Sequence, residues 1–347
     1  MSDFSKPDPQ QIAASWRAPM GWLRITSIDM HTAGEPLRVF TSGLPHLEGR
    51  TVLEKRRDFR ERFDSLRASL MWEPRGHADM YGAVLSTSED ADLDVFFIHN
   101  EGYSTMCGHA ILALAKLAVE CKIVTGPVVT FSTPAGQITA NATAQNGQVM
   151  EASFRNVPSF VLLRDIPVEL PGFSSVTIDV AYGGAFYAVV PAANLGLALD
   201  VGNYSNIIAM GRRIKQAVMS RYQILHPIEP ELGFLYGTIF TGPAAQAGHH
   251  SRNVCVFADG EVDRSPTGTG ISARVALGIA RGELELNERI TVESILGSTM
   301  TVAAVEEVTY EGRNAIVPEV SGSAYFTGRH EFYIDPTDPL RGGFLLR

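Results

Sequence analysis

The sequence has few cysteines and no long apolar run. Among its 347 residues, only Cys107, Cys121 and Cys255 are cysteines, too few for a disulfide framework, and we expect reduced thiols. No apolar stretch approaches the ~20 residues that cross a bilayer, and residues 1–20 lack the basic start and apolar centre of a secretory signal. These absences predict a cytoplasmic protein that has no membrane partner and that begins with a loose tail at residues 1–20.

Positive charge is also scarce. The chain has 29 Lys and Arg against 38 Asp and Glu, which gives a formal net charge of -9. Nucleic acids attract basic surfaces, and the one compact basic stretch, Lys55–Arg57 with Arg60 and Arg62, is interpreted as a solvated helix face. We therefore expect no nucleic acid partner.

The length suggests two domains, and the sequence contains an internal repeat. A single hydrophobic core stops growing at roughly 250–300 residues, and this chain has 347. Three blocks recur in the same order at offsets of 150, 160 and 161 residues. The pairs are Ile28–Phe40 with Ile178–Val190, Cys107–Ile111 with Thr267–Ile271, and Val129–Phe131 with Ile290–Val292. Their order and spacing favour a duplicated domain.

The pattern of each half predicts mostly β-strand and one buried helix. Segments rich in Val, Ile and Thr are punctuated by Gly and Pro, as is typical of strands and turns. Ala110–Val119 and Ile271–Ala280 are apolar nearly all round, which predicts helices enclosed by the sheets. The stretch 156–172, which carries Pro and Gly, is the expected linker. We predict domains at 21–170 and 171–325, with residues 326–347 returning to the first domain.

Cys107 and Thr267 occupy equivalent places, directly before these two helices. A glycine-rich turn that opens a helix leaves N–H groups unpaired at the positive end of the helix dipole, where anions bind. Two such turns that face each other would form a pocket for one carboxylate or phosphate. The dipole also favours thiolate, so we expect the pKa of Cys107 to lie below its ordinary value, which makes Cys107 a candidate base. Cys121 and Cys255 are expected in the core.

Several motifs, in order, resemble the proline racemase family. They extend over about residues 25–328 and comprise Met106–His109, Asp263–Gly270, His31–Pro36, Glu73–Met80 and Ser321–Ala324. The resemblance implies an α/β fold of the α+β type that is similar to diaminopimelate epimerase. Its two pseudo-symmetric halves would each wrap a curved, mostly antiparallel sheet around a central helix. It also implies a site between the halves that needs no cofactor and no metal.

The resemblance further implies a reaction. In the racemases and epimerases of this family, one cysteine removes the α-proton from one face of a proline ring and a second cysteine protonates the other face. Here Thr267 stands at the second position, and its hydroxyl cannot act as a comparable acid or base. The exchange resembles the trans-3-hydroxy-L-proline dehydratases of the family, which use a single cysteine. We therefore expect a lyase that dehydrates a small imino acid, trans-3-hydroxy-L-proline, to pyrroline-2-carboxylate.

Roles for individual residues follow from the same resemblance. Cys107 is the expected proton acceptor, and Asp263 is expected to pair with the ring ammonium. The N–H groups expected to hold the substrate carboxylate belong to Gly108, His109, Gly268 and Thr269. Thr267 replaces the second cysteine. Either Thr267 or His109 could protonate the leaving hydroxyl, and the sequence does not decide between them.

Three other interpretations stay open. The first is a proline racemase or 4-hydroxyproline 2-epimerase, and the second is a binding protein that keeps the carboxylate pocket without turnover. The third is a metallohydrolase, but no His-Glu-x-x-His motif supports it. Its ligands would come from His31, Glu35, His77, Asp79 and His109. A homodimer is one assembly that the sequence allows.

Overall fold

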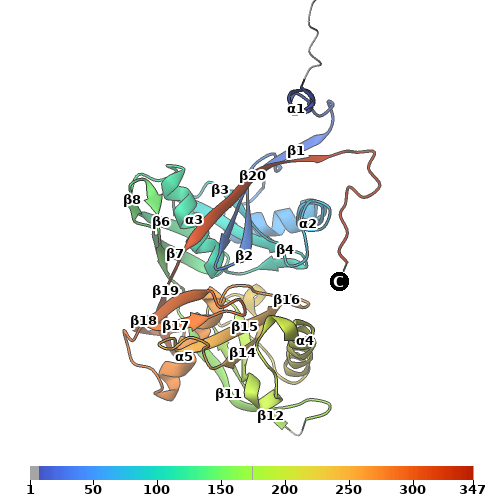
Figure 1. Cartoon of the computed structure of the whole chain (residues 1–347). Coiled ribbons are helices and arrows are strands. Elements are labelled where there is room, and N and C mark those ends of the chain that lie inside the picture. The colour runs from blue at the N-terminus through green and yellow to red at the C-terminus, as the bar shows by residue number, and fades with distance from the viewer. Residues whose placement is uncertain (1–7, 174, 347) are drawn as a thin grey trace, which may run out of the picture.

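Two lobes, stacked one above the other, make up the molecule (Figure 1). The computed structural model describes residues 8–173 and 175–346. The upper lobe consists of β1 (Leu23–Thr32), β2 (Glu35–Ser42), α2 (Val52–Met71), β3 (Tyr81–Ser86), β4 (Leu93–His99), β5 (Gly102–Ser104), α3 (Gly108–Glu120), β6 (Val128–Thr133), β7 (Gly136–Asn141), the short hairpin β8 (Ala144–Gln145) and β9 (Gln148–Val149), β10 (Ala152–Arg155) and β20 (Ala324–Ile334). The lower lobe consists of β11 (Phe160–Glu169), β12 (Ser175–Tyr182), β13 (Phe186–Pro191), α4 (Tyr204–Arg221), β14 (Leu235–Gly242), β15 (Ser251–Phe257), β16 (Glu261–Val262), α5 (Gly268–Arg281), β17 (Ile290–Glu293), β18 (Thr299–Tyr310) and β19 (Arg313–Gly322).

Strand pairing repeats from one lobe to the other. In the upper lobe β1 pairs antiparallel with β2, β2 parallel with β3, β3 antiparallel with β4, β4 parallel with β6, and β6 antiparallel with β7. The series β12, β13, β14, β15, β17 and β18 repeats these orientations in the same order. The helices repeat as well, because α2 and α4 precede the third strand of each series, and α3 and α5 precede the fifth. The repeat seen in the sequence therefore corresponds to a repeat of topology.

The last strand of each repeat crosses to the other lobe. β20 pairs antiparallel with β1, and β11 pairs antiparallel with β12. The stretch 156–172 is consequently strand for most of its length, and its interpretation as a linker is wrong. Pro167 and a bulged register between Val161 and Ile166 interrupt the alternation of β11, which is why the segment lacks an ordinary strand pattern. These pairings favour a division of the fold near residue 156, and the domain bounds themselves stay a prediction.

α3 and α5 are the buried centres of the lobes. All residues of α3 from Gly108 to Ala118 are buried, and α5 is buried from Gly268 to Ala273. The prediction of two helices enclosed by sheet is therefore confirmed. Cys121, at the C-terminal end of α3, is exposed, so its assignment to the core is wrong. Burial decreases along the end of α3, where Val119 and Glu120 are only partly buried.

The basic stretch on α2 is solvated only in part, because Arg60 and Arg62 are exposed as expected whereas two of its residues are buried. Lys55 is buried, and its Nζ lies 2.6 Å from a carboxylate oxygen of Asp94. Arg56 is also buried and lies 2.9 Å from a carboxylate oxygen of Glu231 in the lower lobe. Buried cations are tolerated when they are paired, so charge alone was a poor guide to exposure here.

The N-terminal segment packs lightly against the upper lobe. Residues 1–7 of the expected tail lie outside the described residues. The helix α1 (Pro9–Ala14) has no buried residue, and Trp16 contacts the ring of Tyr333 edge-on with ring centroids 5.2 Å apart. Among the described residues, no helix is both long and apolar enough to cross a membrane.

Candidate active site

The N-termini of the two buried helices meet between the lobes. A Cβ atom placed on Gly108 would lie 2.7 Å from the Cα of Gly268, and one placed on Gly268 would lie 2.8 Å from the Cα of Gly108. Only glycine allows this approach at either position. The first N–H groups of α3 and α5 have no partner within their helices, so both sets are available to one anion at the point of contact.

A small cavity lies at this contact. The cavity is lined by all of the residues that the sequence assigned to the site, which are Cys107, Gly108, His109, Asp263, Thr267, Gly268 and Thr269. It is also lined by residues to which the sequence gave no catalytic or substrate-binding role, which are Glu35, named only as a possible metal ligand, and Tyr81, Met106, Tyr187, Tyr236, Cys255 and Phe257. The walls combine aromatic rings with a few ionisable groups, as is typical of sites for small molecules.

Cys107 lines the upper-lobe side of the cavity, as the residue that directly precedes α3. Its side chain is buried, and its Sγ lies 3.1 Å from Nδ1 of His109. His109 Nε2 lies 3.2 Å from the carbonyl oxygen of Pro36. A carbonyl only accepts, so Nε2 carries a hydrogen in this contact, and Nδ1 of the neutral ring is then an acceptor for the thiol hydrogen.

The electrostatic surroundings of Cys107 differ from the expectation. Burial raises the pKa of the Cys107 thiol well above its usual range, and the negative charge of Asp263 raises it further. The Ala110 backbone and the Tyr81 hydroxyl lower this pKa and are outweighed. The expected lowering of the pKa by the helix dipole is therefore wrong for this site, because desolvation of the thiolate is the larger effect.

Thr267 occupies the opposite side of the cavity as the residue that precedes α5. Its φ of 68° is unusual for a β-branched residue. Its hydroxyl oxygen is buried without an ordinary hydrogen bond to any described residue. The Cys255 thiol interacts with this hydroxyl, and burial raises the pKa of Cys255 well above its usual range. Cys255 is thus buried, as expected, but it also borders the cavity.

Two carboxyl groups border the cavity between these sides. Asp263 follows β16, and one of its oxygens accepts the N–H of Ser265 at 2.7 Å. Glu35 begins β2 and is fully buried, and its Oε2 accepts the N–H of Arg264 at 2.7 Å. Thr269 belongs to the same wall, and its hydroxyl oxygen lies 2.6 Å from the Tyr187 hydroxyl.

Comparison with known proteins assigns the chain to a family. The model of the proline racemase family matches residues 27–345. The chain is 52% identical to a trans-3-hydroxy-L-proline dehydratase of Colwellia psychrerythraea over 94% of both chains. It is 46% identical to a trans-3-hydroxy-L-proline dehydratase of Homo sapiens, over 93% of this chain and 95% of that protein. The chain belongs to the proline racemase family.

The solved structures of this family agree with the fold. A hydroxyproline epimerase from Agrobacterium vitis, with bound trans-4-hydroxy-L-proline, superposes with a TM-score of 0.89 at 30% identity. The superposition covers 94% of this chain and 96% of that one. The expected fold class, a mixed α/β fold that is mostly sheet, is confirmed.

The metallohydrolase interpretation finds no support in the arrangement of its proposed ligands. In the part of the chain that the structure describes, no group of three or more His, Cys, Asp or Glu side chains is placed to hold a metal ion. His31 stacks on Tyr325 with ring centroids 5.2 Å apart. Asp79 pairs with Arg264 at 2.6 Å and accepts the Tyr204 hydroxyl at 2.6 Å, so it ties the lobes together.

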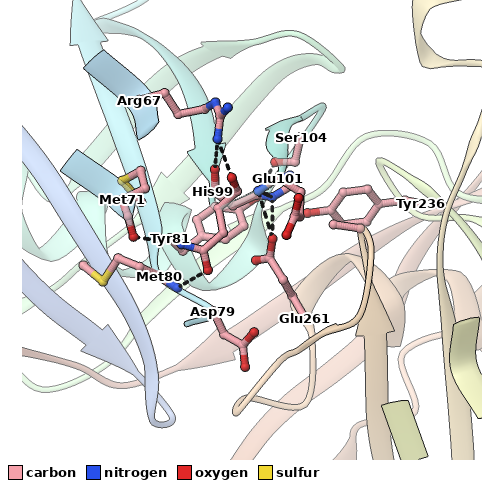
Figure 2. A network of polar contacts seen from close by, with 12 residues as sticks. Arg67, Met71, Asp79, Met80, Tyr81, His99, Glu101, Ser104, Tyr236 and Glu261 are labelled. Carbon is pink, nitrogen blue, oxygen red and sulfur yellow. Dashed lines mark hydrogen bonds and ion pairs between the residues drawn. The ribbon is translucent and has the colours of Figure 1, made fainter. Parts of the chain in front are cut away.

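A polar network beside the cavity joins the lobes (Figure 2). Glu261, from β16 of the lower lobe, points at the 99–101 turn of the upper lobe; its Oε1 lies 2.9 Å from Nδ1 of His99 and accepts the Glu101 N–H at 3.2 Å. Arg67 donates to the backbone carbonyl of His99 at 3.0 Å. The His99 ring stacks on Tyr81, whose ring contacts His109 edge-on. The network therefore supports the wall against which His109 packs.

Proposed function

We propose that this chain dehydrates trans-3-hydroxy-L-proline to pyrroline-2-carboxylate and water, with Cys107 as the base. The observation that supports this most is the pairing of Cys107 with Thr267 at the meeting helix N-termini. A thiol stands at one of two equivalent positions and an alcohol stands at the other. The relatives named trans-3-hydroxy-L-proline dehydratase, at 44–52% identity, support the same reaction.

The proposed binding mode uses the charges of the cavity. The substrate carboxylate would lie between the helix N-termini and accept from the N–H groups of Gly108, His109, Gly268 and Thr269. The ring ammonium would face the Asp263 carboxylate. As the α-proton leaves, negative charge builds on the carboxylate, and donors that already point at it stabilise that charge without rearranging. The chemistry then needs neither metal nor pyridoxal.

Substrate binding would also prepare the base. In the empty site, the negative charge of Asp263 raises the pKa of Cys107. A ring ammonium beside Asp263 offsets that charge and so favours the thiolate. His109 Nδ1, 3.1 Å from the sulfur, is placed to accept the thiol hydrogen. Burial lowers the pKa of His109, so the ring is neutral and able to accept before substrate arrives.

An epimerase is the second candidate, and Cys255 is the observation that favours it. Its thiol borders the cavity beside Thr267, on the side from which a second acid would protonate the ring. Against this role, Cys255 lies within a β-strand with no exposed surface, whereas Cys107 opens a helix at the anion site. We therefore assign Cys255 to the wall and leave dehydration as the proposed reaction.

A product assay separates these candidates. The purified protein is incubated separately with trans-3-hydroxy-L-proline, trans-4-hydroxy-L-proline and L-proline, and the cyclic imine is trapped with an amine reagent while chiral chromatography follows epimers. We expect imine from trans-3-hydroxy-L-proline alone and no epimer from the other two. An absence of imine would refute dehydration, and an inverted product would establish the epimerase. Loss of turnover in Cys107→Ser with ligand binding retained distinguishes an enzyme from a binding protein.

A further inference from the structure

The stereochemistry of the proposed substrate limits where its leaving group can lie. In trans-3-hydroxy-L-proline, the hydroxyl is on the face of the ring opposite the carboxylate. The α-hydrogen is also opposite the carboxylate, because the two are substituents of the same carbon. Hydroxyl and α-hydrogen therefore share a face. If Cys107 removes the hydrogen, the hydroxyl leaves on the Cys107 side of the cavity, away from Thr267.

Besides Cys107, three groups of the upper lobe line the cavity and carry an acidic hydrogen, namely Glu35, Tyr81 and His109. The Tyr81 hydroxyl is already hydrogen bonded to Ser104. Both ring nitrogens of His109 are engaged, one with Cys107 and one with the Pro36 carbonyl. Glu35 differs, because its Oε1 is fully buried and has no hydrogen-bond partner among the described residues. A buried carboxyl oxygen without a partner is costly and is expected to meet one in the complex.

The fold holds Glu35 firmly in this place. Glu35 directly follows the turn of the β1–β2 hairpin, where Ala33 and Gly34 both have positive φ, 53° and 93°. The tip of this hairpin docks on the lower lobe, because Ser298 donates to the Ala33 carbonyl at 2.6 Å. The Arg264 N–H fixes Oε2 at 2.7 Å, which leaves Oε1 as the free end of the carboxyl group.

The surroundings of Glu35 favour its protonated form. Burial raises the pKa of Glu35 well above its usual range, and the negative charges of Asp263 and Asp79 raise it further. Arg264 acts in the opposite direction, through its charge and its N–H, and is outweighed. A carboxylic acid kept neutral in this way is able to donate a proton at neutral pH.

We propose that Glu35 is the acid that protonates the 3-hydroxyl as it leaves, an inference that rests on the proposed dehydration. Cys107 takes the α-proton, the electron pair of that bond forms the C2–C3 double bond, and the C3–O bond breaks. The Glu35 O–H proton goes to the leaving oxygen, so that water departs and Glu35 becomes a carboxylate. The enamine then tautomerises to the imine. Proton exchange with solvent restores the thiolate of Cys107 and the acid of Glu35, and no further reactant is needed.

The test compares two leaving groups in Glu35→Gln, which keeps the shape and neutral charge of the protonated side chain. Hydroxide needs a proton to depart, whereas fluoride does not. Turnover of trans-3-hydroxy-L-proline, followed by trapped imine, is expected to fall by about 100-fold or more, as for loss of a general acid. Turnover of trans-3-fluoro-L-proline, followed by released fluoride, is expected to change by less than about threefold, because fluoride departs without a proton from Glu35. Fluoride release also reports that the variant is folded and that Cys107 works.

Tyr236→Phe is the matched control, because it removes another buried oxygen of the same cavity, one that interacts with Tyr81 and not with Glu35. Its ratio of hydroxy to fluoro turnover is expected to equal that of the wild type. The inference is overturned if Glu35→Gln loses both activities equally, if it loses neither, or if Tyr236→Phe shifts the ratio as strongly. A wild-type protein that forms no imine from trans-3-hydroxy-L-proline refutes the proposed function instead, before any variant is compared.

Discussion

The N-termini of α3 and α5 have similar backbone arrangements but carry different side chains. Both open with a glycine, and the two glycines touch. Cys107 precedes α3 in an extended conformation with its sulfur beside His109, whereas Thr267 precedes α5 at a φ of 68° with its hydroxyl lacking an ordinary partner. In the mechanism proposed here, the two helix N-termini both bind the substrate carboxylate, and only the Cys107 side transfers the α-proton. Glu35 belongs to the upper lobe, as Cys107 does.

Truncation of the two residues gives the largest contrast. Cys107→Ala removes the base and is expected to lower kcat for trans-3-hydroxy-L-proline by about 10³-fold to 10⁴-fold. Thr267→Ala removes a hydroxyl with no assigned proton transfer. We expect kcat to fall by about tenfold or less, because only packing and substrate positioning change. Steady-state imine formation measures both. Equal losses in the two variants would break the comparison, because both sides would then carry chemistry.

Contact between the helix N-termini is the next feature to disturb. In Gly268→Ala, the added Cβ would meet the Cα of Gly108 at 2.8 Å and push the donors apart. We expect kcat to fall by about 100-fold, as for loss of a preorganised donor, and the free energy of unfolding to fall by about 1–3 kcal/mol. Gly126→Ala is the control, since nothing lies within 4 Å of its Cβ position. An unchanged kcat in Gly268→Ala would show that the N–H groups do not hold the substrate.

The raised pKa of Cys107 predicts a pH dependence. In the proposed mechanism the base acts as thiolate, so activity falls as pH falls below the pKa of the thiol, and burial places that pKa above its usual range. With trans-3-fluoro-L-proline, which needs no leaving-group acid, kcat/KM is expected to rise about tenfold per pH unit through neutral pH. A profile that is flat from neutral pH upward would mean that the free enzyme already holds a thiolate, and would restore the lowered pKa that the sequence predicts.

Cys255 should matter least. Cys255→Ala is expected to change kcat by about threefold or less and to lower the free energy of unfolding by about 1 kcal/mol, a usual effect of a small deletion in a core. The measurement is imine formation together with denaturant unfolding. A loss of activity that approaches that of Cys107→Ala would make Cys255 the second acid and favour the epimerase.

Local patterns in the sequence were enough to predict much of the fold and of the candidate site. The glycine-rich turns before two apolar helices located Cys107 and Thr267, because a helix start is encoded by neighbouring residues. The recurrence of those turns predicted the repeat. The strand β11 was not predicted, because Pro167 and its bulged register hide the alternation that marks a strand.

Features that depend on distant residues could not be predicted in this way. Glu35 enters the cavity because a hairpin tip docks on the other lobe, and no pattern around residue 35 reveals the Arg264 N–H or the nearby Asp263. The direction of the Cys107 pKa shift was missed for the same reason, since it follows from burial. Lys55 and Arg56 look solvated in sequence and are buried beside acids that come from other segments.

The central claim is that one thiol makes this site a dehydratase, and Thr267→Cys in deuterated water tests it most directly. Wild-type protein and variant are incubated with L-proline, and the D-isomer and deuterium at the α-carbon are measured. We expect no D-proline from the wild type and D-proline deuterated at the α-carbon from the folded variant, because a second thiol then faces the first. D-proline from the wild type, or none from a variant that still dehydrates trans-3-hydroxy-L-proline, would contradict it.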